Sequence, residues 1–140
     1  MSAMTGAEIV ARMLRDAGVK HVFGIVSIHN MPIVDAISRL NGISMVTPRN
    51  EQSATHMADG YARATGHLGV VLASTGPGTT NAVTGLYESA YASSRVLLVT
   101  GQAETTFYGK GKGYVHEAEN QKPMLETVIL VVVQEIKFLM

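Results

Sequence analysis

The chain has 140 residues, enough for one domain with a buried core, and 46% of them are apolar. It carries 11 basic and 11 acidic side chains, so the formal charge is zero and gives no electrostatic reason to expect nucleic acid. The absence of cysteine excludes a disulfide framework and a thiolate metal site.

The first third of the chain alternates helical periods with short β-branched runs. Thr5-Gly-Ala-Glu8 has the pattern of a capping box and predicts a helix that ends near Gly18. Four residues mark its expected apolar face: Ile9, Val10, Met13 and Leu14. Three more elements are predicted before residue 48: a strand over 21–26, a helix over 32–40 and a strand over 43–47.

In the next part of the chain, Asn50 is expected to cap a third helix that Gly66 ends. Its buried face is predicted from the helical spacing of five residues: Ala54, Met57, Ala58, Tyr61 and Ala62. The continuous apolar run 69–74 indicates a central parallel strand. A helix capped by Thr79 or Thr80 should follow and reach about Ser93, with a second buried strand over 96–100.

This order of elements predicts an α/β fold, a doubly wound and mainly parallel sheet with helices on both faces. Ligands of such sheets bind at the carboxyl ends of the strands. Four segments should meet at that edge: the loop after Val26, Pro48–Glu51, Ser74–Gly78 and Thr100–Gln102. Residues 103–121 are less regular, and the Gly-Lys alternation from Gly109 to Gly113 is typical of a surface loop rather than a Walker motif.

Four segments, in this order, resemble the pyrimidine-binding domain of thiamine diphosphate enzymes, in the branch of acetolactate synthase, benzoylformate decarboxylase and pyruvate oxidase. They are Gly18-Val-Lys-His-Val-Phe23-Gly24, Arg49-Asn-Glu51-Gln-Ser-Ala54-Thr-His-Met57-Ala58-Asp59-Gly60-Tyr61-Ala62-Arg63, Ser74-Thr-Gly76-Pro77-Gly78-Thr-Thr-Asn81 with Gly85-Leu86, and Arg95-Val-Leu-Leu-Val-Thr100-Gly101. The resemblance covers about residues 4 to 125 and implies one such domain over 1–140, truncated or with an atypical tail from about 126.

Glu51 has two interpretations. By position alone, an acid in the first turn of a helix favours the helix dipole by about 0.3–1 kcal/mol. The resemblance instead implies that Glu51 is the catalytic carboxylate, which hydrogen-bonds N1′ of the cofactor's aminopyrimidine and activates the cofactor for attack on a 2-oxo acid.

The resemblance also implies contacts to the pyrimidine from Val26, Ser27, Thr75 and Asn81. For Thr75 and Asn81, a structural capping role is the alternative. Val26-Ser27 stands where the family usually has Pro-Gly, so the backbone there departs from the family pattern.

Two histidines are candidates for the substrate pocket. His29 would lie near the substrate mouth, with plain solvent exposure as the alternative. His116 stands where acetolactate synthases typically have Phe-Gln-Glu, and related decarboxylases use histidine in that region for proton transfer.

The family's diphosphate site, a Gly-Asp-Gly motif that binds Mg²⁺, does not occur in this sequence. The resemblance therefore implies that only the pyrimidine end of thiamine diphosphate binds here, with no metal ligand in this chain. A diphosphate-binding domain would come in trans or from a missing C-terminal part, and no FAD site can be assigned. A homo-oligomer is expected, with contacts through the small-residue face of Ala54, Ala58 and Ala62.

Three functions remain open: part of a decarboxylase or carboligase that is inactive alone, the small subunit of a split two-chain enzyme, or a non-catalytic oligomerisation or regulatory module. The N-terminus lacks the pattern of a signal peptide. The longest apolar run, Val128–Val133, is far shorter than the roughly 20 residues that cross a bilayer. A cytoplasmic protein without membrane contact is therefore expected.

Overall fold

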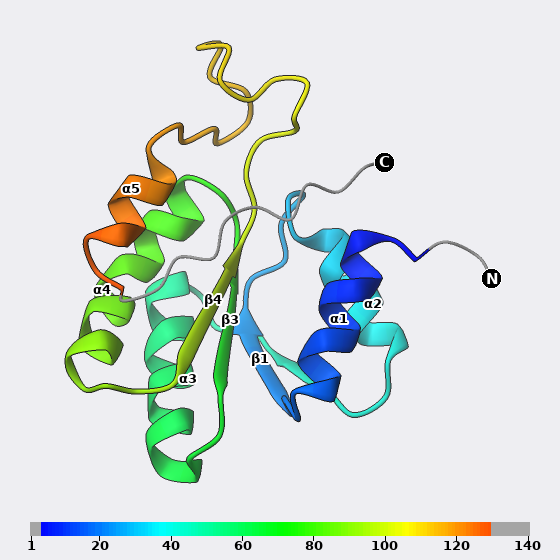
Figure 1. Ribbon diagram of the computed structural model, residues 1–140, viewed down its shortest axis with the longest axis vertical. Helices are drawn as coiled ribbons and strands as arrows, with labels where there is room; N and C mark the ends of the chain where they lie inside the picture. Colours follow the sequence, from blue (N-terminus) through cyan, green and yellow to red (C-terminus); the bar gives the residue numbers. More distant parts are fainter. Residues whose placement is uncertain (1–3, 130–140) are drawn as a thin grey trace.

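The computed structural model describes residues 4–129 and contains a four-stranded parallel sheet in the order β2-β1-β3-β4 (Figure 1). The strands are β1 (His21–Gly24), β2 (Ser44–Val46), β3 (Gly69–Ala73) and β4 (Val96–Thr100). Each neighbouring pair is parallel, with Val22 opposite Val70 and Val70 opposite Leu97. Parallel pairing across a crossover is what the alternation of strands and helices predicts.

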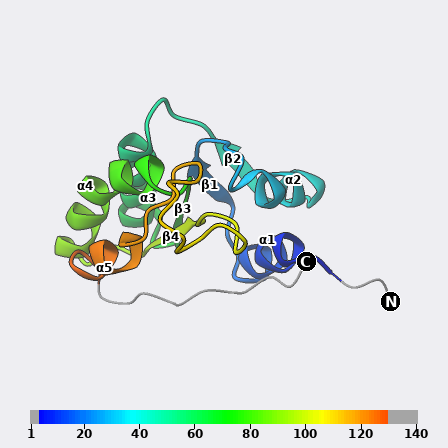
Figure 2. The same cartoon turned by 90° about the horizontal axis from the view of Figure 1, so that it is seen from above.

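Helices cover both faces of the sheet. On one side lie α1 (Gly6–Asp16) and α2 (Met31–Arg39), and on the other lie α3 (Glu51–Thr65) and α4 (Pro77–Tyr91), as Figures 1 and 2 show. A short helix that the sequence did not predict, α5 (Gln121–Glu126), lies beside α4. The predicted doubly wound α/β fold is confirmed.

The central strand β3 is buried along its whole length, as its continuous apolar run predicted. Successive side chains of β3 point to opposite faces of the sheet. Val70 and Leu72 belong to the apolar cluster beneath α1 and α2, whereas Val71 joins the cluster beneath α3 together with Phe23. One strand thus supports both helical layers.

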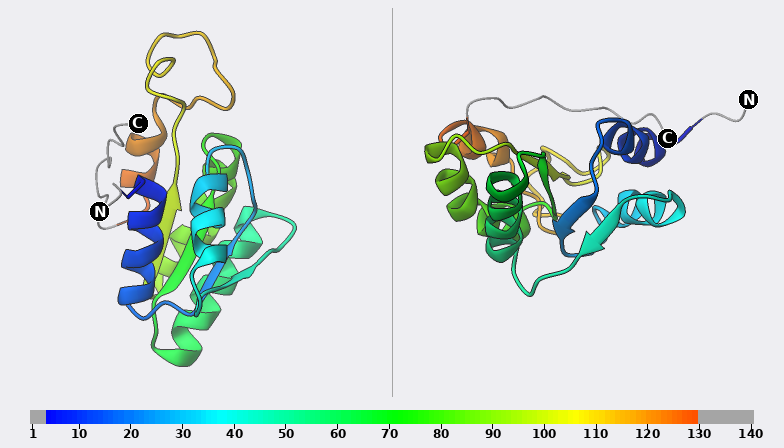
Figure 3. Two further views of the ribbon diagram at one scale, coloured as in Figure 1. Left: turned by 90° about the vertical axis from the view of Figure 1, so that its right-hand side faces the viewer. Right: turned by 90° about the horizontal axis from the view of Figure 1, so that it is seen from below.

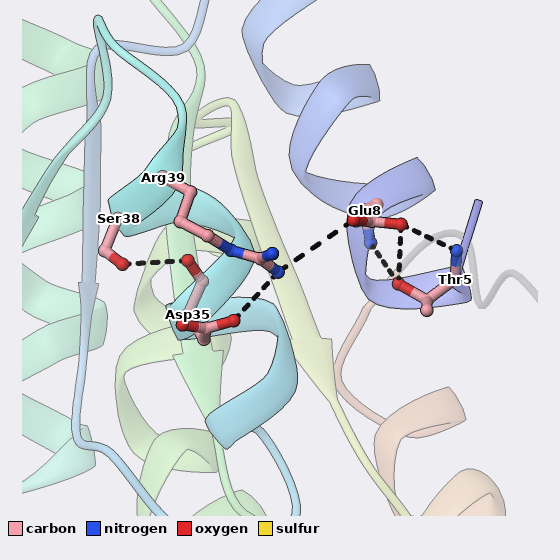
Figure 4. Close-up of polar contacts among 5 residues, drawn as sticks. All are labelled: Thr5, Glu8, Asp35, Ser38 and Arg39. Carbon is pink, nitrogen blue, oxygen red and sulfur yellow. Dashed lines mark hydrogen bonds and ion pairs between the residues drawn. The ribbon is translucent and has the colours of Figure 1, made fainter. Parts of the chain in front are cut away.

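The capping box at the start of α1 is confirmed. The Thr5 backbone N–H donates to Glu8 Oε2 at 2.8 Å, and the Glu8 N–H donates to Thr5 Oγ1 at 3.3 Å (Figure 4). The bond from the Thr5 backbone holds the pKa of Glu8 below its ordinary value. Arg39 of α2 lies 2.8 Å from Asp35 and 3.9 Å from Glu8, so it links the exposed edges of the two helices.

Two details of the predicted helices are wrong. In α1, Ile9 and Met13 are exposed, because the face toward the sheet is formed by the residues at i, i+3, i+4 and i+7, namely Ala7, Val10, Ala11 and Leu14. In α4, neither Thr79 nor Thr80 is the N-cap. The helix begins at Pro77 after Gly76, and the buried Thr79 donates its hydroxyl hydrogen to the Ser74 carbonyl at 2.8 Å.

The predicted buried face of α3 is right for its alanines, but Met57 is exposed. Ala54, Ala58 and Ala62 are at most 6% exposed, and Ala54 and Ala58 pack against the sheet within the domain. The expectation that these three alanines form contacts between copies of the chain is therefore wrong.

Helices α3 and α4 make the most extensive contact between any two elements of the described structure. A β-carbon on Gly85 of α4 would lie 2.6 Å from Thr55 Cβ of α3, so only glycine permits this approach. One helical turn further along α3, Asp59 is buried beside Arg63 at 2.7 Å. Burial would raise the pKa of Asp59, but the hydroxyls of Ser94 and Ser89 and the Arg63 guanidinium outweigh it and lower that pKa.

The C-terminal residues 130–140 lie outside the described residues, and most of the apolar run Val128–Val133 falls among them. The predicted atypical tail therefore stays a prediction. None of the helices described over residues 4–129 is long and apolar enough to cross a membrane.

Replacing Gly85 with alanine should lower the free energy of unfolding by about 1–3 kcal/mol, because the new methyl group forces α3 and α4 apart. The matched control is Gly60→Ala in α3, where a β-carbon meets nothing within 4 Å and should stabilise the helix by up to about 1 kcal/mol. Urea denaturation of the two variants measures both changes. Equal stabilities would show that the helices do not meet at Gly85.

Candidate functional site

The carboxyl edge of the sheet brings together the segments that the sequence singled out. The loop after β1 reaches the end of β3 through His29 and Ser74, and the end of β3 reaches the segment after β4 through Thr75 and Gln102. The first turns of α3 and α4 meet through Glu51 and Asn81. Residues 101–120 extend beyond the same end of the sheet (Figure 3, left).

Glu51 is the first residue of α3, and it is half-buried. The cap of this helix is formed by Asn50, whose side chain accepts from the Gln52 N–H at 2.8 Å. The Glu51 carboxylate points instead toward α4, where its Oε2 accepts from Asn81 Nδ2 at 3.0 Å. No residue of the described part of the chain donates a hydrogen bond to its other oxygen, Oε1. The Glu51 carboxylate therefore does not cap its own helix.

Gly78 of α4 lies close to both Glu51 and Ser74. A β-carbon at this position would lie 2.9 Å from Ser74 Cβ and 3.2 Å from Glu51 Oε1. Any larger residue at this position would displace Ser74 or the Glu51 carboxylate. The close approach of Gly78 to both residues joins the Glu51 region to the end of β3.

The turn after β1 contains the two expected pyrimidine contacts in this loop. Val26 is 46% exposed, and the Ser27 N–H donates to Asn30 Oδ1 at 2.8 Å. The buried Ser27 hydroxyl has no hydrogen-bond partner among the described residues.

Asn30 is almost fully buried, and its Nδ2 donates to the Ile25 carbonyl at 2.9 Å, so it closes the turn that the family usually builds with Pro-Gly. Asn30 was missed, although an asparagine just before Met31-Pro32 is a typical helix-start signal.

The two candidate histidines lie together. Their ring centres are 6.1 Å apart, and His29 Nδ1 is 3.0 Å from Ser74 Oγ. Burial lowers the pKa of His29, and the nearby His116 lowers it further. The Nε2 atom of His29 is buried and has no hydrogen-bond partner in the described structure. His116 itself is exposed and has φ 59°, and its carbonyl lies so close to Gly76 that a β-carbon there would clash with it.

Thr75 is fully buried, and its hydroxyl hydrogen has three acceptors near it, of which Gln121 Oε1 at 3.0 Å is the closest. Gln121 also accepts from the Gly76 N–H at 2.9 Å and donates to the Gly101 carbonyl at 2.8 Å. Gln102 donates to the Ala118 carbonyl at 2.8 Å. These two glutamines close the base of the 103–120 loop. They were missed because nothing in the local pattern shows that they meet.

Two hollows, of about 180 and 450 Å³, lie away from the carboxyl edge, one between α1 and α2 and one around Arg63 and Arg95 at the opposite end of α3. Within residues 4–129, no three His, Cys, Asp or Glu side chains are grouped so that they could hold a metal ion. The geometry thus offers a carboxylate and a histidine pair on a surface that a second surface could cover.

Residues 4–124 match the family model described as "Thiamine pyrophosphate enzyme, N-terminal TPP binding domain". The chain is 47% identical over 109 residues to acetolactate synthase isozyme 3 large subunit of Escherichia coli, and 43% identical over 109 residues to acetolactate synthase large subunit of Buchnera aphidicola. It is 43% identical over 105 residues to the mitochondrial acetolactate synthase catalytic subunit of Aspergillus candidus.

These matches cover 75–78% of the chain but only 15–19% of each relative, so the chain spans less than a fifth of the length of these proteins. The matched region, residues 4–124, contains the four described strands, helices α1 to α4 and the start of α5. It therefore includes Glu51 and the carboxyl edge of the sheet. The chain therefore belongs to the thiamine diphosphate enzyme family, as an N-terminal cofactor-binding domain similar to that of acetolactate synthases.

Proposed function

We propose that this chain supplies the pyrimidine side of a thiamine diphosphate site in a 2-oxo acid decarboxylase or carboligase of the acetolactate synthase type. The observation that carries the proposal is the Glu51 carboxylate at the carboxyl edge of the sheet, with Oε2 held by Asn81 and Oε1 close to Gly78 without a hydrogen-bond donor among the described residues.

The residues present fit the pyrimidine end of this cofactor. A β-carbon on Gly78 would lie 3.2 Å from Glu51 Oε1, so the glycine keeps this oxygen free of a side-chain contact from α4. A carboxylate oxygen without a donor is suited to a ring nitrogen that carries or shares a proton.

When bound, thiamine diphosphate supplies the acidic thiazolium C2 and the electron sink for the bond broken in the 2-oxo acid. The part of Glu51 is to hold a proton at N1′ of the aminopyrimidine. A carboxylate can do this because it accepts a hydrogen bond when charged and donates one when protonated. A glutamine of the same length cannot exchange that proton.

Val26 and Ser27 would line the pyrimidine from the β1 side. The exposed Val26 side chain offers an apolar contact, and the unpartnered Ser27 hydroxyl offers a hydrogen bond. A direct cofactor contact from Thr75 would have to replace its bond to Gln121, so we assign Thr75 to anchoring the 103–120 loop.

His29 and His116 would face the substrate side of the site. His29 Nε2 is buried and free of a partner in the described structure, and the lowered pKa keeps this ring neutral at physiological pH. A neutral imidazole beside the site can accept a proton from the substrate or from His116. The open edge would be closed by a diphosphate-binding domain that also carries Mg²⁺, in an oligomer.

Glu51→Gln, in the chain assembled with its diphosphate-binding domain and cofactor, should slow hydrogen–deuterium exchange at thiazolium C2 at least about tenfold, equal to about 1.4 kcal/mol of barrier. The loss follows because the amide cannot hold and release the N1′ proton. Glu126→Gln in α5 is the matched control and should leave the rate unchanged. An unchanged rate in Glu51→Gln would remove this residue from the mechanism.

His116→Ala should raise the pKa of His29 toward its ordinary value, because a neighbouring positive charge is lost. His67→Ala, far from this pair in the exposed turn after α3, should leave that pKa unchanged. NMR titration of the histidine ring signals measures both. A lowered folded-state pKa also means that stability falls as the pH drops below about 6.5, where the unfolded histidine takes up its proton. An unchanged His29 pKa in His116→Ala would show that the two rings do not interact.

A further inference from the structure

Helices α3 and α4 run side by side with a constant offset of residues along their contact. Glu51 meets Asn81, and one turn further along Thr55 meets Gly85. Another turn on, the next pair of residues at this offset, Asp59 and Ser89, are both buried. Residues four apart occupy the same face of a helix, so these contacts form one continuous seam. The Gly85 contact sets how closely the helices approach, and Asn81 and Glu51 occupy the end of the seam at the carboxyl edge.

Charge decides which end of the Asn81 amide contacts the Glu51 carboxylate. The Asn81 amide must present its NH₂ group, because its carbonyl oxygen would repel the carboxylate. Nδ2 donates to Oε2 at 3.0 Å, and this is the only hydrogen bond that the Asn81 side chain makes with residues 4–129. Asn81 is the fifth residue of α4, too far into the helix to be its N-cap, and Gly76 occupies that position.

We propose that Asn81 is a positioning residue for Glu51 rather than a direct contact to the cofactor. By binding Oε2 it fixes the rotation of the carboxylate and leaves Oε1, beside Gly78, as the oxygen that faces the pyrimidine. This inference rests on the proposed role of Glu51. Asn81 would then influence the cofactor only by orienting the Glu51 carboxylate.

The first test uses this chain without cofactor. In the ¹⁵N-labelled protein, one side-chain NH₂ proton of Asn81 should resonate downfield because it is bonded to a carboxylate. Glu51→Ala should move that signal upfield, whereas Glu126→Ala should leave it in place. An Asn81 signal with the same chemical shift in Glu51→Ala would overturn the proposed contact. This result does not depend on the activity of the assembled enzyme.

The second test is a double-mutant cycle on C2 exchange in the assembled, cofactor-loaded protein. Asn81→Ala should slow exchange about tenfold, the effect of losing one hydrogen bond to a charged group. In the Glu51→Gln background, the same substitution should have no further effect, because there is no carboxylate left to orient. Asn81→Asp, which places a like charge against Glu51, should slow exchange more than Asn81→Ala.

The outcomes separate this inference from the function on which it rests. An equal loss from Asn81→Ala in both backgrounds would mean that Asn81 acts independently of Glu51, and would overturn the inference. No loss from Asn81→Ala in the wild-type background would overturn it as well. Failure of Glu51→Gln to slow exchange would overturn the proposed function itself. Urea denaturation of each variant shows whether the fold is retained, and the NMR test decides the contact if a variant does not assemble.

Discussion

The close approach of α3 and α4 is the constraint on which the carboxyl edge depends. At Gly85 the helices come within a distance that excludes any β-carbon, and Thr55 fills the opposite side of that contact. One turn toward the strands' carboxyl ends, this spacing brings the short Asn81 side chain to 3.0 Å from a glutamate on the other helix. A wider helix pair would leave Glu51 free to turn into solvent. Backbone packing, remote from the chemistry, therefore sets where the carboxylate lies.

The loop between β3 and α4 and the first turn of α4 supply the second part of the site. A β-carbon on Gly76 would meet the His116 carbonyl, and one on Gly78 of α4 would meet Ser74 and approach Glu51. The end of β3 is held by buried polar groups, with Thr75 bonded to Gln121 and Thr79 of α4 bonded to the Ser74 carbonyl. Buried donors and acceptors that are satisfied in this way hold a loop rigid, and rigid support keeps a reacting group in place.

Much of this fold could be predicted from the sequence because its signals are local. The capping box at Thr5, the left-handed Gly66 and the buried run of β3 each follow from a few adjacent residues. The catalytic role of Glu51 was inferred only from a long family-like string, since its position alone favoured a helix-dipole role. The Asn81 bond, the Gln102 and Gln121 contacts and the closing of the β1 turn by Asn30 could not be predicted, because each needs tertiary geometry. The exposed Met13 and Met57 show the same limit, since packing decided which side of an amphipathic helix faces the sheet.

The central claim is that this chain presents a pyrimidine-binding edge and relies on another surface for the diphosphate. Calorimetric titration of the purified chain with thiamine diphosphate and Mg²⁺ tests it most directly. We expect no binding in the micromolar range, because residues 4–129 bring no three metal-ligating side chains together that could hold Mg²⁺. A dissociation constant near 1 µM, about −8 kcal/mol, would show that the chain holds the diphosphate by itself and would contradict this claim.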